Sequence, residues 1–236
     1  PDILNGDTNQ QIDSIWQFLE DGDRAAKPKG LVRSTMELKP GDTPKMYRNF
    51  IQGAGARAIG VGYPEEVNLA FDAELCRLAL IWQENFIDAS RHWTGRGQGF
   101  EAPLGENLLE LPEAIVFAKN SRPGQWNKSR GSDYPVFKGY HFDENRRPVF
   151  DYQMDGIVIT DQPVPTLEDD RALITRQFTI VADQPCKLYY LVGQSEQAKI
   201  DGNSIVFGDR WTTQFSGSVK LQLSKDKNGS VVAEID

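Results

Sequence analysis

The chain has 236 residues, of which 39% are hydrophobic and 10% are aromatic, so it can bury the core of one large all-β domain. Its formal net charge of −8 disfavours partners that need a basic surface, and we expect neither nucleic acid nor anionic lipid as a partner. No apolar run approaches the roughly 18 residues of a membrane-spanning helix, so membrane insertion is not expected either.

The N-terminal segment, residues 1–30, predicts one short helix followed by a linker. Ile12 and Ile15 belong to an apolar stripe at helical spacing, and residues 21–30 (DGDRAAKPKG) have the composition of a linker. A helix this short cannot bury its own apolar stripe and must dock elsewhere. We therefore expect a short helix plus a linker in residues 1–30, and the main domain in residues 31–236.

Beyond the linker, the apolar pattern has a period of two, which is typical of strands. Phe150, Tyr152 and Met154, for example, alternate with polar residues. Many short strands with one apolar face predict a mainly β fold, an antiparallel β-sandwich with one short N-terminal helix. Turn signals separate the predicted strands at residues 39–42 (KPGD), 143–145 (DEN), 155–156 (DG), 201–202 (DG) and 227–229 (KNG).

One predicted strand carries an apolar face formed by Cys76, Leu78, Leu80 and Trp82. Since these positions alternate, we expect them to point to the same side of the sheet, with Trp82 in the core.

A glycine-rich motif at residues 52–57 (QGAGAR) is superficially similar to a dinucleotide-binding fingerprint. It lacks the third glycine, and the strand-like residues 58–61 (AIGV) follow it where a helix would be required. We interpret it as a turn between two strands.

The middle of the chain, residues 91–135, is rich in glycine and proline, and we expect a long inserted loop region there. Its first part, residues 93–100 (WTGRGQGF), holds three glycines in five positions beside groups that stack on ligands or bind anions. Loops on a rigid scaffold are common binding sites. The same stretch is also compatible with a structural crossover between two sheets.

The candidate site residues cluster around this loop. Candidates for acid–base chemistry are His92, Asp88 and Glu101, because imidazole titrates near neutrality and paired carboxylates hydrolyse sugars. The alternative for the carboxylates is a solvated rim. Candidates for ligand binding are the two arginines and two tryptophans that we expect to be exposed: Arg91, Trp93, Arg96 and Trp126.

Several kinds of site are not indicated. The sequence has no phosphate-binding loop, nucleophile elbow, zinc-ligand spacing or CxxCH motif. With only His92 and His141, a three-histidine metal site is impossible within the chain, and we predict no metal ligands. The sequence leaves open whether Cys76 and Cys186 form a disulfide.

Several stretches carry a family resemblance. The opening residues 1–4 (PDIL) and 11–19 (QIDSIWQFL) resemble the last helix of a class I c-type cytochrome domain. The region that follows resembles the β-rich part of cytochrome-bearing exported proteins of the planctomycete type. The matching stretches are residues 53–62 (GAGARAIGVG), 67–72 (VNLAFD), 76–82 (CRLALIW), 92–97 (HWTGRG), 137–140 (FKGY) and 148–152 (PVFDY).

The resemblance implies an exported, periplasmic protein involved in electron transfer. It implies haem c in a portion N-terminal to Pro1, because the CxxCH motif and the axial methionine loop are absent here. The β region also resembles the supersandwich domains that accompany mutarotases and polysaccharide lyases, a likeness of fold alone.

Three functions remain open from the sequence. The first is a non-catalytic partner or ligand-binding module of an exported c-type cytochrome or dehydrogenase, docking a redox partner protein or a saccharide. The second is a carbohydrate-active enzyme that acts through residues 88–101. The third is a structural assembly domain, with contacts to its own haem module or to further copies of the chain in a homo-oligomer.

Overall fold

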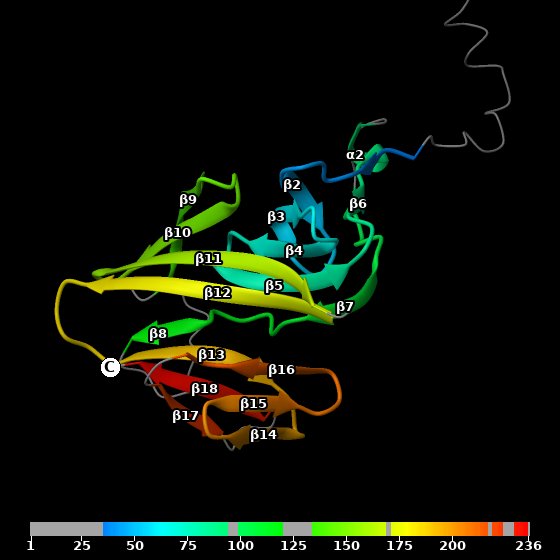
Figure 1. Ribbon diagram of the computed structural model, residues 1–236. Coiled ribbons are helices and arrows are strands. Elements are labelled where there is room, and N and C mark those ends of the chain that lie inside the picture. The colour runs from blue at the N-terminus through cyan, green and yellow to red at the C-terminus, as the bar shows by residue number, and fades with distance from the viewer. Residues whose placement is uncertain are drawn as a thin grey trace, which may run out of the picture. The chain divides into compact units, whose positions relative to one another are not determined.

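The chain divides into two units in the computed structural model, and the unit that begins at Thr35 contains all the described residues (Figure 1). The helix and linker expected in residues 1–30 lie outside the described part of the chain. None of the helices described is long and apolar enough to cross a membrane. The structure describes residues 35–93, 99–119, 134–168, 171–216, 219–223 and 229–235.

The first sheet has five antiparallel strands in the order β2-β3-β4-β5-β7. Its central strand β4 is buried on both faces, so the one-sided alternation expected from the sequence does not hold there. The strands are β2 (Lys45–Ile51), β3 (Gly55–Gly62), β4 (Val67–Asp72), β5 (Arg77–Gln83) and β7 (Glu106–Glu110).

The second sheet has four antiparallel strands in the order β12-β11-β10-β9. Its two longest strands form one hairpin with an unbroken register and lie side by side in Figure 1. The strands are β9 (Val136–Phe142), β10 (Pro148–Met154), β11 (Ile157–Glu168) and β12 (Arg171–Ala182).

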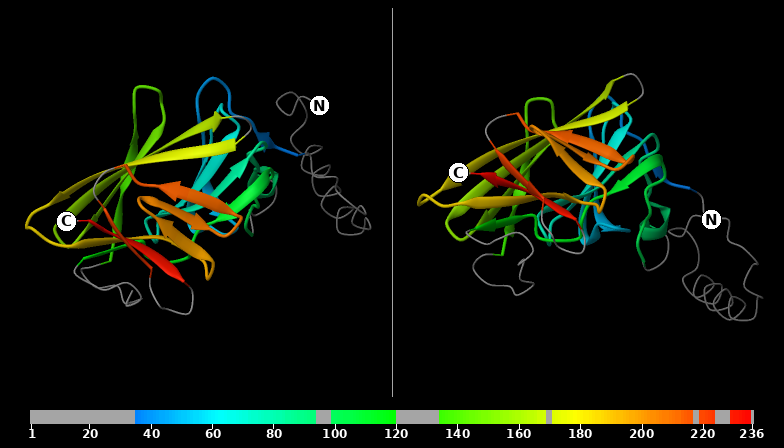
Figure 2. Two further views of the ribbon diagram at one scale, coloured as in Figure 1. Left: turned by 60° about the horizontal axis from the view of Figure 1, so that its bottom comes forward. Right: turned by 90° about the horizontal axis from the view of Figure 1, so that it is seen from below.

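Two smaller antiparallel sheets complete the fold. The third sheet has the strand order β17-β18-β13-β8, and the fourth has the order β14-β15-β16. Figure 2 shows the orange strands β14–β16 together with the red β18. The strands are β8 (Phe117–Lys119), β13 (Leu188–Gln194), β14 (Ala198–Asp201), β15 (Ser204–Phe207), β16 (Trp211–Gln214), β17 (Lys220–Leu223) and β18 (Ser230–Ile235).

Aromatic contacts join the sheets around a shared core. Phe71 of the first sheet stacks on Phe150 of the second, with ring centroids 4.1 Å apart. Phe117 of the third sheet meets Phe178 of the second edge to face at 5.4 Å. The second sheet therefore packs against both the first and the third sheet. The sequence-based prediction of a mainly β, antiparallel sandwich is confirmed.

The turn at residues 52–54 confirms the interpretation of the glycine-rich motif. It links β2 to β3, and Gly53 and Gly55 have φ angles of 82° and 83°, a region that L-residues rarely adopt.

The prediction that the alternating apolar residues of the strand at 76–82 point to the same side of the sheet was wrong. Leu78 belongs to the main core, whereas Leu80 and Trp82 belong to a second core on the other face of the first sheet. A register shift between β4 and β5 at this point inserts one extra residue, which reverses the alternation. Trp82 is fully buried, as predicted.

The expectation of a long inserted loop over residues 91–135 also needs correction. Two strands in this region, β7 and β8, pair with β5 and β13 and are integral to the first and third sheets. Glycine and proline content did not reveal them, because both strands are short.

Candidate functional site

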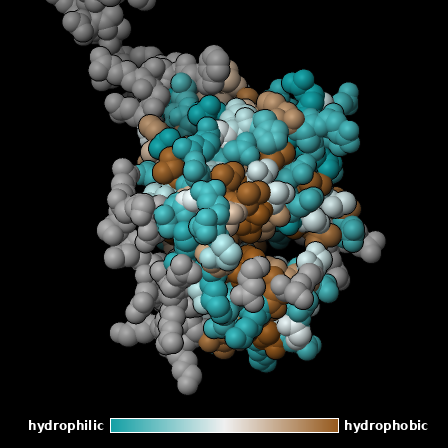
Figure 3. All heavy atoms as spheres, turned by 90° about the vertical axis from the view of Figure 1, so that its left-hand side faces the viewer, coloured by the Kyte–Doolittle hydropathy of each residue, from teal (hydrophilic) through white to brown (hydrophobic). Residues whose placement is uncertain are grey.

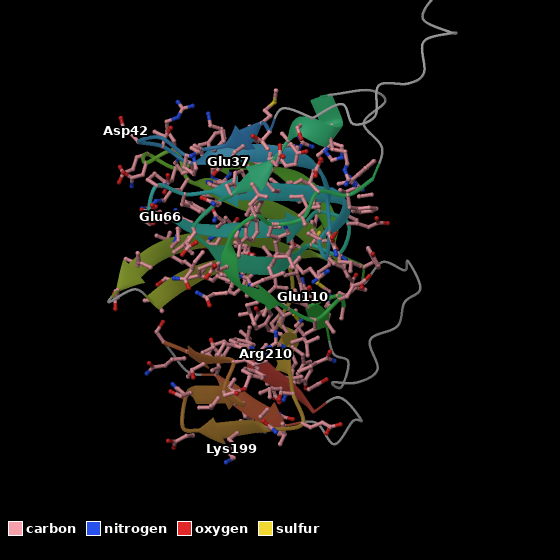
Figure 4. All side chains as sticks on the ribbon, turned by 90° about the vertical axis from the view of Figure 1, so that its right-hand side faces the viewer. Glu37, Asp42, Glu66, Glu110, Lys199 and Arg210 are labelled. Carbon is pink, nitrogen blue, oxygen red and sulfur yellow. The ribbon has the colours of Figure 1, made fainter. Side chains whose placement is uncertain are left out.

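The candidate site is built on a short helix, α2 (Ser90–Trp93), that follows β6 (Ile87–Asp88). Asp88 fixes this helix, because its Oδ1 accepts hydrogen bonds from the backbone N–H groups of Ser90 at 2.9 Å and Met36 at 2.8 Å. Burial disfavours the carboxylate, but these two bonds outweigh it and lower the pKa of Asp88. Met36 precedes β1 (Glu37–Leu38), which pairs with β6; Glu37 is labelled in Figure 4.

His92 on α2 ties two segments together. Its Nδ1 is hydrogen-bonded to the hydroxyl of Tyr47 on β2, and its Nε2 lies 2.9 Å from the carbonyl oxygen of Gly99. Because a carbonyl can only accept, Nε2 carries the hydrogen, and in the neutral ring Nδ1 accepts the Tyr47 O–H. Burial and the Glu101 carboxylate raise the pKa of Tyr47 to about 12, so this hydroxyl stays protonated at neutral pH.

The segment at residues 99–101 is joined to the end of β2 by its backbone. The N–H of Glu101 donates to Phe50 O at 3.0 Å, and the N–H of Gln52 donates to Glu101 O at 2.9 Å. This pairing sets Phe50 beside Phe100, with ring centroids 5.6 Å apart. The two rings are 39% and 46% exposed, so a pair of large aromatic side chains faces solvent on a fixed backbone.

Arg91 completes the surface. Its Nη1 donates to Phe100 O at 3.3 Å, and its Nε lies 3.9 Å from Oε1 of Glu101. Glu101 is 9% exposed, and its Oε1 has no hydrogen-bond partner among the described residues. We call Phe50, Arg91 and Phe100 the Phe50–Phe100 surface.

The structure thus brings three of the predicted site residues together: Arg91, His92 and Glu101. Asp88 lies under α2 as a structural anchor. The backbone of Trp93 ends α2, but its side chain, like Arg96 and Trp126, lies outside the described residues. Sequence reasoning missed Tyr47 and Phe50, which come from a strand about 40 positions earlier.

The described residues contain no group of three or more His, Cys, Asp or Glu side chains placed to bind a metal. His92 uses both nitrogens, and Nδ1 of His141 is paired with Asp151 at 2.8 Å. Cys76 and Cys186 are both free thiols.

A second polar cluster, which we did not predict from the sequence, lies between the second and third sheets. Arg176 on β12 bonds both carboxylate oxygens of Asp161 on β11, at 3.2 and 2.5 Å, and donates to the hydroxyl of Tyr190 on β13 at 2.7 Å. Arg176 also lies over the ring of Phe178, 4.6 Å from its centroid. Asp161 is 1% exposed, so the cluster is a buried clamp between sheets.

No family model, curated protein or solved structure matches the chain.

Proposed function

We propose that this chain is a non-catalytic β-sandwich partner module of an exported c-type cytochrome or dehydrogenase, and that the Phe50–Phe100 surface docks its protein partner. The observation that carries the proposal is the exposed aromatic pair, held on a backbone that is hydrogen-bonded on both sides. Aromatic and arginine side chains supply most of the binding energy at protein interfaces. An arginine beside the rings adds charge that orients a partner.

The remaining parts of the site support binding more than chemistry. His92 has both ring nitrogens engaged and no free nitrogen for proton transfer, and Asp88 uses its Oδ1 to anchor two backbone N–H groups. The carbohydrate-active alternative therefore has less support. The proposal places the haem in another portion of the protein, in keeping with the sequence resemblance, and places the protein in the periplasm.

The test uses the complete open reading frame that encodes this chain, expressed in a host that attaches haem c. We expect the product to carry covalent haem, and we expect the separately expressed haem portion to bind this chain in calorimetric titrations. A parallel arm measures retention of the chain on insoluble polysaccharides. A reading frame without haem, or polysaccharide retention without binding of the haem portion, would overturn the proposal.

A further inference from the structure

Strand β12 is an open edge of the second sheet. It pairs with β11 over all twelve residues without a register shift, and none of the other described strands pairs with its second side (Figure 1). An edge strand leaves a row of backbone N–H and C=O groups free to pair with another strand. A straight edge of this length is an unusual liability for a protein that does not use it.

The devices that usually protect such an edge are missing from β12. The strand has no proline and no bulge, and in residues 173–182, the part of β12 whose side chains are described, the exposed positions carry no charge. Its one interior charge, Arg176, is directed inward and neutralised by Asp161. The exposed positions within residues 173–182 are Leu173, Thr175, Gln177, Thr179, Val181 and Ala182.

The other long edge strands differ in this respect. Exposed charged residues stand on all three: Arg48 on β2, Glu110 on β7 and Lys138 on β9. The pairings of β2 and β9 with their neighbours also contain register shifts. The open edge of β12 is therefore a distinct feature of this sheet.

The sequence of β12 is nearly symmetric about Gln177. On the exposed face, Leu173 mirrors Val181 and Thr175 mirrors Thr179. On the other face, Ile174 mirrors Ile180 and Arg176 mirrors Phe178. A two-fold axis through an antiparallel strand pair brings each residue opposite its mirror position, so this sequence is complementary to itself.

We propose that β12 pairs with β12 of a second copy around a two-fold axis through Gln177, so that two four-stranded sheets become one sheet of eight. Matched β-branched and apolar pairs then face each other on the exposed side, where cross-strand pairs stabilise sheets. Leu173 and Val181, now 46% and 60% exposed, are covered. Figure 3, which shows the side where β12 ends, has hydrophobic side chains gathered across its middle.

The inner face supports the same partner. Ile174 and Ile180 pack against the main core but are only partly buried, which fits a sheet that stops at this edge. In the pair, Arg176 meets Phe178 of the second copy, the same combination of cation and ring that the chain already makes within β12. The inference does not depend on the proposed docking function.

Sedimentation velocity of the whole chain tests the proposal with charges placed on the axis. We expect a concentration-dependent dimer for the unchanged chain. Gln177→Lys and Gln177→Glu should each weaken the dimer at least tenfold, since like charges meet on the axis. An equal mixture of the two variants should recover it, because opposite charges then meet.

Gln153→Lys, an exposed change on the central strand β10, is the matched control and should leave the dimer unchanged. Circular dichroism verifies that each variant is folded, and because position 177 is exposed we expect no loss of structure. A monomer at all concentrations, a dimer that survives both single variants, or no recovery in the mixture would overturn the proposal.

Discussion

His92 and Gly99 are joined by a hydrogen bond of 2.9 Å between the ring Nε2 and the backbone carbonyl, across six intervening residues. Through its other nitrogen, the same ring holds Tyr47, so one side chain connects α2, β2 and the segment that carries Phe100. The position of the exposed aromatic pair therefore depends on a residue that is not itself part of the Phe50–Phe100 surface.

Replacing this ring should loosen the surface locally. His92→Ala removes two hydrogen bonds of about 1 kcal/mol each, and we expect the free energy of unfolding to fall by about 1–2 kcal/mol. Hydrogen exchange should quicken at the amides of Glu101 and Gln52, which pair this segment with β2. His141→Ala, in which an exposed hydrogen bond with Asp151 is lost, is the control and should cost under about 0.5 kcal/mol.

The buried clamp predicts a much larger loss of stability. Arg176→Ala leaves the carboxylate of Asp161 buried and unpaired, which costs about 3–5 kcal/mol. Lys187→Ala, at an exposed lysine that pairs with Glu234, should cost less than about 1 kcal/mol. Urea denaturation measures both. Equal effects of the two substitutions would show that the clamp does not hold the sheets together.

The lowered pKa of Asp88 predicts a pH dependence of stability. Because its folded pKa lies below the unfolded value of about 3.9, the group stabilises the fold above that value. This contribution is lost as the pH falls through the folded pKa. Asp88→Asn should therefore flatten the stability profile between about pH 5 and pH 2. Thermal unfolding over this range provides the profile, and an unaltered slope in Asp88→Asn would contradict the account.

The two thiols should differ in reactivity. Burial and the nearby Asp72 carboxylate raise the pKa of Cys76 to about 12, and the side chain is fully buried. Cys186 is partly exposed. At pH 8 a thiol reagent should label Cys186 in the folded protein and Cys76 only after unfolding. Cys186→Ser should abolish the first reaction, and rapid labelling of two thiols would refute the buried position of Cys76.

Much of the sandwich could be predicted, because a strand that buries only one face has apolar and polar residues at alternate positions of its sequence. In β10, Phe150, Tyr152 and Met154 are buried while Gln153 is exposed, as the pattern indicated. The reversal between Leu78 and Leu80 could not be predicted, because a bulge depends on pairing with a neighbouring strand.

The candidate site was found only in part, for a similar reason. Arg91, His92 and Glu101 are close in sequence, so sequence proximity alone was enough to group them. Phe50 joins them through a backbone pairing between β2 and residue 101, which no local pattern reveals. One feature of the sequence could have predicted the buried clamp. Asp161 continues the inward series of Ile157 and Ile159, so a charge at that position needs a buried partner.

The most direct measurement of the proposed docking function is the affinity of the chain for the proposed haem-bearing portion, measured with three forms of the chain. The account predicts that the double substitution Phe50→Ala and Phe100→Ala raises the Kd at least tenfold. Phe142→Ala removes a ring of the same 46% exposure as Phe100 from β9, and it should leave the Kd unchanged. Equal Kd values for the double variant and the unchanged chain, with both folded, would contradict it.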